Sequence, residues 1–253
     1  MLLQPGDKIG YTESINQPTK IRMADGAEVA ITDWSWRTLY SSIDILSGAT
    51  DDQIAAFSYS LGQNVKASSN VGASQLRTAT LKDTNLDSGE SKMPAEQEFI
   101  CYAIAVHVEQ YAYNSNNSGE AAYGVGAAAL PIVTGGNLAI AMARLTVSLE
   151  VTQKDFFQNR LGWFSAGGGA LVSANANAAA AIRTYASNGL PTKQAIDTAP
   201  VPVHIGGTEA YAVLFQNGDG NAINWVTEAG VSDAAVVLRF TPSMIGLHKR
   251  PSA

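Results

Sequence analysis

An almost unbroken apolar run extends from Phe99 to Val108, and His107 is its single polar residue. An amphipathic helix would repeat its apolar positions every three or four residues, and no such stripe is resolved in this run. β-branched and aromatic residues are frequent in it, and Pro94 stands just outside it. The pattern therefore predicts a strand.

The predicted strand has two unlike faces, because successive side chains point to opposite sides of a sheet. A bulky row and a smaller, mixed row result: Ile100, Tyr102, Ile104, Val106 and Val108 against Phe99, Cys101, Ala103, Ala105 and His107. We expect both faces to be covered, as in a sandwich of two sheets. Ile100, Ile104 and Val106 are predicted to be core residues of a central strand.

Alternation of apolar and polar residues predicts further strands. The segment 145–152 alternates cleanly, with Leu145, Val147, Leu149 and Val151 inward and Thr146, Ser148, Glu150 and Thr152 outward. A hairpin is predicted around the turn Asp25-Gly26. The other predicted strands are Thr38–Leu46, part of "QLRTATLKDTNLDSGESKM", and the C-terminal segments "APVPVHI", "EAYAVLFQ", "NAINWVT" and "AAVVLRF".

Two segments predict short helices. In "SGATDDQIAAFSYSLG", Thr50 and Gln53 have the spacing of a capping box, and one helical face would carry Ile54, Phe57 and Leu61. Asp51 and Asp52 would then lie in the first turn, where the helix dipole explains two carboxylates without an acid–base role. The second segment, "SANANAAAAIRTYASNG", is rich in Ala, begins at the candidate cap Ser173 and ends at Gly189.

The order of these elements predicts an all-β fold. About a dozen strands, separated by turn signals and interrupted by two or three short helices, favour an antiparallel jelly-roll sandwich. "NVKASSNVGAS" predicts a loop, and "DFFQNRLGWFSAGGG" an aromatic turn that ends in three glycines. We expect residues 1–75 to form an N-terminal arm and additional strands, and residues 76–253 to form the jelly-roll domain. A single decorated roll is favoured, with a compact double jelly roll as the alternative.

Composition narrows the function classes. The chain has 253 residues, a net charge of −6 and only 15% charged residues, which is well below the roughly 25% of an average soluble domain. The acidic balance argues against a nucleic-acid-binding surface over the whole domain, although "HKRPSA" is a small basic tail. "MLLQPGDKIGY" does not resemble a signal peptide. "AAYGVGAAALPIVTGGNLAIAMARL" is interrupted by Pro131 and glycines, so we do not expect a membrane span there.

Few residues have a pattern that indicates chemistry. The histidines His107, His204 and His248 lie in separate segments without a partner at metal-ligand spacing. Cys101, the only cysteine, is expected to be a buried, inert thiol. Ser165 lacks the first glycine of a hydrolase nucleophile elbow. We therefore expect no catalytic, cofactor-binding or metal site, no required cofactor, and no enzyme.

Three weaker patterns also favour structural interpretations. Gly124 and Gly126, like the run of glycines at 167–169, lack the strand-to-helix context of a nucleotide-binding loop. "NGDGN" offers Asp219 and Asn221 as calcium ligands but lacks the terminal Glu of such a loop, so a hairpin turn is favoured and a surface calcium is left open. Four tryptophans are expected to pack in a core or an interface, with a sugar-binding platform as the alternative: Trp34, Trp36, Trp163 and Trp225.

Three segments together resemble jelly-roll major capsid proteins of tailless icosahedral bacterial viruses: "TNLDSGESKMPAEQEFICYAIAVHV", "LTVSLEVTQKDFFQNRLGWFSAGGG" and "PVPVHIGGTEAYAVLFQ" with "AAVVLRF". The likeness spans roughly residues 75 to 245. It implies a structural protein of the virion shell that self-assembles into homo-oligomeric trimeric or hexameric capsomers. The implied partners are further copies of the chain and other capsid proteins, with a membrane or genome often beneath the shell and no small-molecule substrate.

A different class of function is the alternative, namely a carbohydrate-binding β-sandwich such as a lectin-like or receptor-binding spike domain. Assembly separates the two, because a shell protein should form large species and a binding module should stay small. The ends of the chain bear on the capsid interpretation. Residues 1–18 carry two prolines and little apolar periodicity, so we expect them, together with "HKRPSA", to act between subunits.

Overall fold

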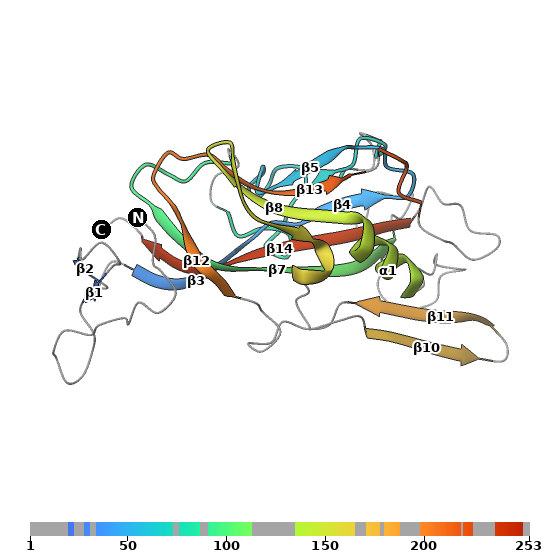
Figure 1. The fold of residues 1–253 in the computed structure, drawn as a ribbon. Helices are drawn as coiled ribbons and strands as arrows, with labels where there is room; N and C mark the ends of the chain where they lie inside the picture. The colour runs from blue at the N-terminus through green and yellow to red at the C-terminus, as the bar shows by residue number, and fades with distance from the viewer. Residues whose placement is uncertain are drawn as a thin grey trace.

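The computed structural model describes residues 20–22, 28–30, 34–72, 76–86, 91–112, 135–164, 171–177, 180–187, 198–218, 220–224 and 236–249. Figure 1 shows that two β-sheets form its main body, one packed on the other. The predicted all-β sandwich is therefore confirmed. Within the described ranges, no helix has the length and apolarity needed to cross a membrane.

The larger sheet has six strands, and its long central strands are β7 (Glu98–Ala112) and β14 (Val236–Lys249). Its order is β12 (Thr198–Ile205), β7, β14, β4 (Ile43–Leu46) and β6 (Lys66–Ala67), and β3 (Trp34–Tyr40) also pairs with β14. The second sheet has the order β5 (Gln53–Ala56), β13 (Tyr211–Asn217), β8 (Leu145–Val151) and β9 (Lys154–Arg160).

The antiparallel pairs of the sandwich are nested along the chain. β4 pairs with β14, β5 with β13, β7 with β12, and β8 with β9. Among these eight strands the first therefore pairs with the last, the second with the second to last, and so on inward to the β8–β9 hairpin. Two further pairings, β14 with β7 and β13 with β8, join these ribbons into the two sheets.

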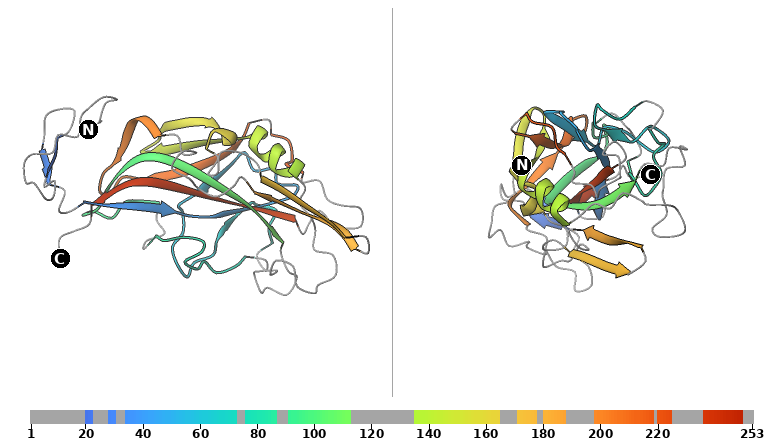
Figure 2. Two further views of the ribbon diagram at one scale, coloured as in Figure 1. Left: turned by 90° about the horizontal axis from the view of Figure 1, so that it is seen from below. Right: turned by 90° about the vertical axis from the view of Figure 1, so that its right-hand side faces the viewer.

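Smaller elements lie around the sandwich. β1 (Lys20–Arg22) and β2 (Glu28–Ala30) form a two-stranded pair, which confirms the strands of the predicted N-terminal hairpin, while its turn Asp25-Gly26 lies outside the described residues. β10 (Leu171–Asn177) and β11 (Ala180–Ser187) form a second pair, which Figures 1 and 2 show beside the sandwich, near α1 (Gly135–Arg144). A 3₁₀ turn, η3 (Leu161–Phe164), follows β9.

The core lies between the two sheets and draws on all the long strands. Phe215 of β13 meets Phe240 of β14 with ring centroids 5.5 Å apart, and both rings are buried. Cys101, Ile104, Val106 and Val108 of β7 belong to the same cluster as the inward row of β8. Apolar burial of this extent is the main favourable term in folding.

β7 confirms the predicted strand but changes its faces midway. Its register against β14 shifts where Ala103 pairs with Ile245 and Cys101 with Gly246, which leaves Tyr102 as an extra residue. Such a bulge moves the following residues to the other face. The core row is consequently Phe99, Cys101, Ile104, Val106 and Val108. The predicted bulky row is therefore wrong at Ile100 and Tyr102, although Ile100 is buried on the outer side.

The predicted strand Thr38–Leu46 is divided into β3 and β4, which keep one register against β14. Ser243 pairs with Tyr40, and Phe240 pairs with Ile43. Between them the Ser41 N–H donates to the carbonyl of Pro242 at 3.3 Å, and Pro242 has no N–H to return. The missing ladder bond accounts for the break.

Both predicted helices are strands. Residues 53–56 form β5, whose register against β13 runs from Gln53–Gln216 to Ala56–Val213. Residues 171–187 contain β10 and β11, which pair with each other. Helix propensity is a weak preference that tertiary pairing overrides, and here each segment has a strand partner. Asp51 does not sit in a helix; its carboxylate accepts from the Ser69 N–H at 3.0 Å.

Three other predictions differ in detail. "DFFQNRLGWFSAGGG" is not simply a turn, because β9 pairs with β8 through a two-residue connection in which Thr152 and Gln153 both have positive φ. The helix α1 was not predicted. No named strand occurs among the described residues of "QLRTATLKDTNLDSGESKM", and of "NAINWVT" only 221–224 is described, with Ile223 in a single bridge to Ala49.

The N-terminal part of the chain is integral to the sandwich. β3, β4 and β5 occupy places in both sheets, and Leu39, Ile43 and Ile54 lie in the core. The sandwich therefore includes residues 34–56, which the sequence analysis assigns to the segment before the jelly-roll domain.

Candidate functional site

Four charged side chains, which we name the charged cluster, lie on the outer face of the six-stranded sheet; three are buried, and the side chain of Arg77 is 11% exposed. They are Asp44 of β4, Arg239 of β14, and Arg77 and Asp83 of the segment 76–86. One oxygen of Asp44 lies 3.2 Å from Nε of Arg77, and its other oxygen lies 3.2 Å from Nε of Arg239. Nη2 of Arg77 lies 2.6 Å from Asp83.

The charged cluster holds residues 76–86 against the six-stranded sheet. Two aspartates face two arginines, so the buried charges balance. Burial raises the pKa of Asp83, but the hydrogen bonds and charge of Arg77, with the Thr80 N–H, outweigh it and hold that pKa below its ordinary value. Each member is ion-paired with at least one other member, which indicates a structural function.

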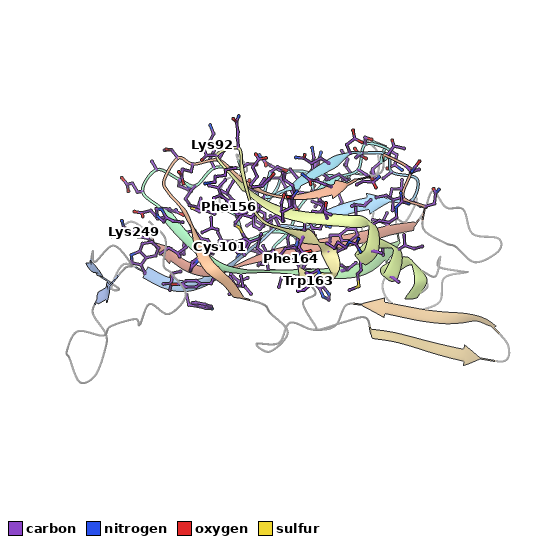
Figure 3. All side chains as sticks on the ribbon, viewed as in Figure 1. Lys92, Cys101, Phe156, Trp163, Phe164 and Lys249 are labelled. Atoms are coloured by element: carbon purple, nitrogen blue, oxygen red, sulfur yellow. The ribbon has the colours of Figure 1, made fainter. Side chains whose placement is uncertain are left out.

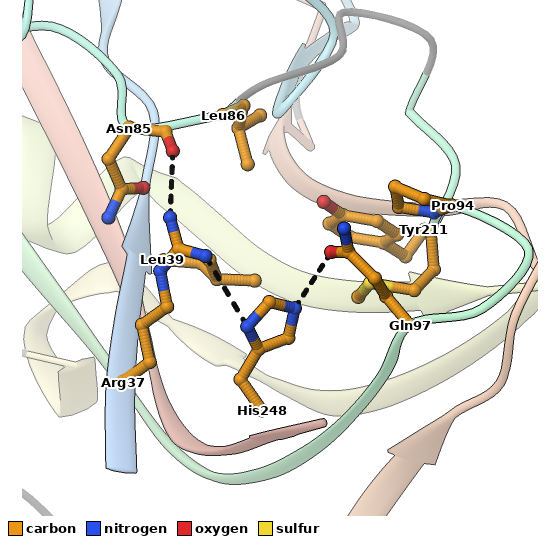
Figure 4. Close-up of a pocket in the computed structure, with 9 residues that line it drawn as sticks. Arg37, Leu39, Asn85, Leu86, Pro94, Gln97, Tyr211 and His248 are labelled. Atoms are coloured by element: carbon orange, nitrogen blue, oxygen red, sulfur yellow. Dashed lines mark hydrogen bonds between the residues drawn. The ribbon is translucent and has the colours of Figure 1, made fainter. Parts of the chain in front are cut away.

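A small pocket near the end of β14 is lined by polar groups around His248 (Figure 4). Nη1 of Arg37 lies 3.3 Å from Nδ1 of His248, and Nε2 of His248 lies 2.9 Å from Oε1 of Gln97. A guanidinium only donates, so Nδ1 accepts and the neutral imidazole carries its proton on Nε2. The pocket has room for about one or two water molecules, which is too little for a sugar.

Three ionisable side chains, Glu98, Lys249 and His204, meet at the same end of the sheet. Glu98 of β7 accepts from Nζ of Lys249 at 2.6 Å and lies 2.9 Å from Nε2 of His204. Burial raises the pKa of Glu98, but the hydrogen bonds and charges of Lys249 and His204 hold it below its ordinary value. The group links β7, β12 and β14.

Large apolar side chains are exposed at four of the described positions: Trp36, Leu61, Leu81 and Trp163. Trp36 is 64% exposed and Trp163 66% exposed. Trp163 lies on η3, near Phe164 in Figure 3. Trp36 lies on β3, and its ring is 5.9 Å from that of Tyr102 across the outer face of the six-stranded sheet. Exposed aromatic side chains of this kind are typical of contact surfaces.

The structure keeps the residues tested for chemistry apart. His107 lies half-buried on β7, while His204 and His248 belong to the two groups just described. Among the described residues, no group of three or more His, Cys, Asp or Glu side chains is placed to hold a metal ion. Cys101 is buried as predicted, and burial raises the pKa of its thiol to about 12.

Several predicted features lie outside the described residues, namely Ser165, Gly124, Gly126, the glycines at 167–169, Asp219 and Trp225. The predicted role of "HKRPSA" between subunits is wrong for His248 and Lys249, because both belong to β14 and bond within the chain. Of the tryptophans, Trp34 is buried as the core reading expects, whereas Trp36 and Trp163 are exposed.

The sequence analysis missed the charged cluster. The signal was Asp44 between Ile43 and Ile45, since a carboxylate inside a buried strand requires partners. No protein-family model matches the chain, and no curated protein matches it. The proposals below therefore rest on the fold and the surface of this chain.

Proposed function

We propose that the sandwich is a jelly roll and that the protein is a structural subunit of an icosahedral bacterial virus shell, assembling into trimeric or hexameric capsomers. The observation that carries the proposal is the nested pairing of β4, β5, β7 and β8 with β14, β13, β12 and β9. Four antiparallel pairs nested in this way are the pairing that an eight-stranded jelly roll, or double Greek key, requires. Viral capsid domains are a major use of that architecture.

The resemblance named above adds to this support, because the segments that carry it include β7, β8, β12 and β13. Fold alone does not fix function, since lectin domains and cupins share the jelly roll. The low charge of 15% also favours a surface that is covered in an assembly. In this proposal the protein is not an enzyme and takes no cofactor.

Electron microscopy and sedimentation velocity of the purified full chain test the proposal. Closed particles or regular capsomers of many subunits are the expected result. A single small species at every protein concentration would contradict it.

Carbohydrate binding is the second candidate function, and the exposed Trp36 beside Tyr102 is the observation that favours it. A sugar ring packs well against such a flat aromatic surface. Saturable binding of a glycan by the wild-type chain, lost in Trp36→Ala, would support this alternative and count against the shell protein.

A further inference from the structure

We propose that two copies of this chain meet through an uncharged surface on the outer face of the six-stranded sheet. This Trp36 surface consists of Trp36, Thr38, Tyr102, Ile245 and Leu247. The inference deepens the proposed function, on which it rests, by naming the surface through which subunits associate.

The register of the strands places these residues together. Leu247 pairs with Trp36, and Ile245 pairs with Thr38 and, on its other side, with Ala103 of β7. Leu39, the neighbour of Thr38, lies in the core, so the alternate residues Trp36 and Thr38 face outward. Tyr102, displaced by the bulge, joins them at a ring distance of 5.9 Å.

The rest of this face is already covered. The charged cluster, a hydrogen bond from Tyr59 to the Ser42 carbonyl and one from Tyr40 to the Leu81 carbonyl hold the segment after β5 over the β4 half of the sheet. Figure 2 shows this segment on the side of the sheet opposite β8 and β9. Trp36 lies beyond this cover and remains 64% exposed.

The net charge of the chain and the absence of charge on the Trp36 surface favour a second copy of the chain as the partner at this surface. Each chain carries a net charge of −6, so two copies repel unless their contact avoids unbalanced charge. None of the five residues of the Trp36 surface is charged, and the neighbouring charges are paired within the chain, Glu98 with Lys249 and Asp44 with Arg239. A self-complementary contact suits such a neutral face.

The sheet edges at β12, β9 and β3 are poor alternatives for association. β12 carries Pro200 and Pro202, which cannot donate to an added strand. β9 has exposed Lys154 and Asp155 and a bulge at Phe157, where φ is 54°. At β3, the Asn85 side chain donates to the Thr38 carbonyl and accepts from the Tyr40 N–H. A face, rather than an edge, is the better contact.

The test compares Trp36→Lys with Trp163→Lys in the full chain. Trp163 is 66% exposed, so the control makes the same change at a matched side chain outside the surface. Sedimentation velocity over a concentration series gives the association, and thermal melting reports the fold. We expect Trp36→Lys to weaken association by about tenfold or more and Trp163→Lys to associate like wild type. Thr38→Lys repeats the test if Trp36→Lys fails to fold.

The outcomes separate this inference from the proposed function. Wild-type particles that persist in Trp36→Lys and Thr38→Lys overturn the contact but leave the shell function standing. A wild-type dimer that Trp36→Lys dissociates supports the contact and contradicts the shell function. A wild-type chain that stays monomeric, or that binds a glycan through Trp36 without associating, overturns both.

Discussion

Gly246 lies on β14 at a point where β7 leaves no room for a side chain. A Cβ atom built on it would lie 1.9 Å from the carbonyl oxygen of Ile100 and 3.0 Å from the Phe99 ring. The position faces Cys101, next to the bulge at Tyr102. Because the obstacle is backbone in a buried sheet, it has little freedom to move, and only glycine fits.

Gly246→Ala should therefore lower the free energy of unfolding by about 3 kcal/mol or more. Gly218→Ala is the control, since nothing lies within 4 Å of a Cβ there. Urea unfolding of both variants measures the difference. Equal stability of the two variants would show that the strands can separate at the bulge.

The pKa of Glu98 predicts a dependence of stability on pH. A carboxyl whose pKa is lowered by folding stabilises the protein above its unfolded pKa and loses that effect as the pH falls through the folded value. Unfolding free energy should thus fall on acidification below about pH 5, and less steeply in Glu98→Gln, which no longer titrates. Glu96→Gln, at an exposed position two residues away, should keep the wild-type slope. Parallel slopes for all three proteins would exclude a part for Glu98.

At the scale of elements, the charged cluster joins β4 and β14 to a segment that has little regular structure of its own. The described residues 76–86 are attached to the sheet mainly through polar contacts such as the Arg77–Asp44 pair and the hydrogen bonds of Asn85. Removing one member of a buried charge group leaves its partners without compensation. Such a segment therefore depends on the cluster for its position.

We expect Asp44→Ala to lower the free energy of unfolding by about 3 to 5 kcal/mol, because the buried Arg239 and its neighbour Arg77 would both lose the carboxylate that lies between them. Asp52→Ala, the same change at an exposed position, should be nearly neutral. Chemical denaturation compares them, and limited proteolysis within 76–86 reports whether the segment detaches. An Asp44→Ala protein as stable as Asp52→Ala would refute the structural role.

Sequence patterns predicted those elements whose own residues carry the period of a strand. β8 and β13 alternate because one face of each is buried, and the predicted inward row of β8 is confirmed. At β5, Thr50 and Gln53 have helical spacing, but the decisive partner, β13, lies more than 150 residues away and leaves no local signal. The bulge at Tyr102 is likewise a property of two strands together. Four tryptophans were visible in the sequence, but the exposure of Trp36 depends on where the cover of the sheet ends.

For the whole molecule, the two ends of the chain have different expected roles. Deleting residues 250–253 should leave the melting temperature unchanged, whereas deleting 248–253 should lower it by several degrees, since His248 and Lys249 bond to Arg37, Gln97 and Glu98.

Deleting residues 1–18 should preserve the melting temperature but give fewer or smaller particles. Unimpaired particles after that deletion would contradict a role between subunits, and a lost fold would place those residues in the sandwich.

The nested pairing also sets the order in which the chain can fold during synthesis. Ile43 of β4 pairs with Phe240, about 200 residues later, so β4, the first of the eight nested strands, leaves the ribosome well before its partner strand is made. At roughly 5 to 20 residues per second, that interval is about 10 to 40 s. Of the eight nested strands, β8 and β9 alone form a hairpin from neighbouring residues, and the longer-range pairings fold slowly. During that wait the apolar residues of β3 and β4 have no partner strand to cover them.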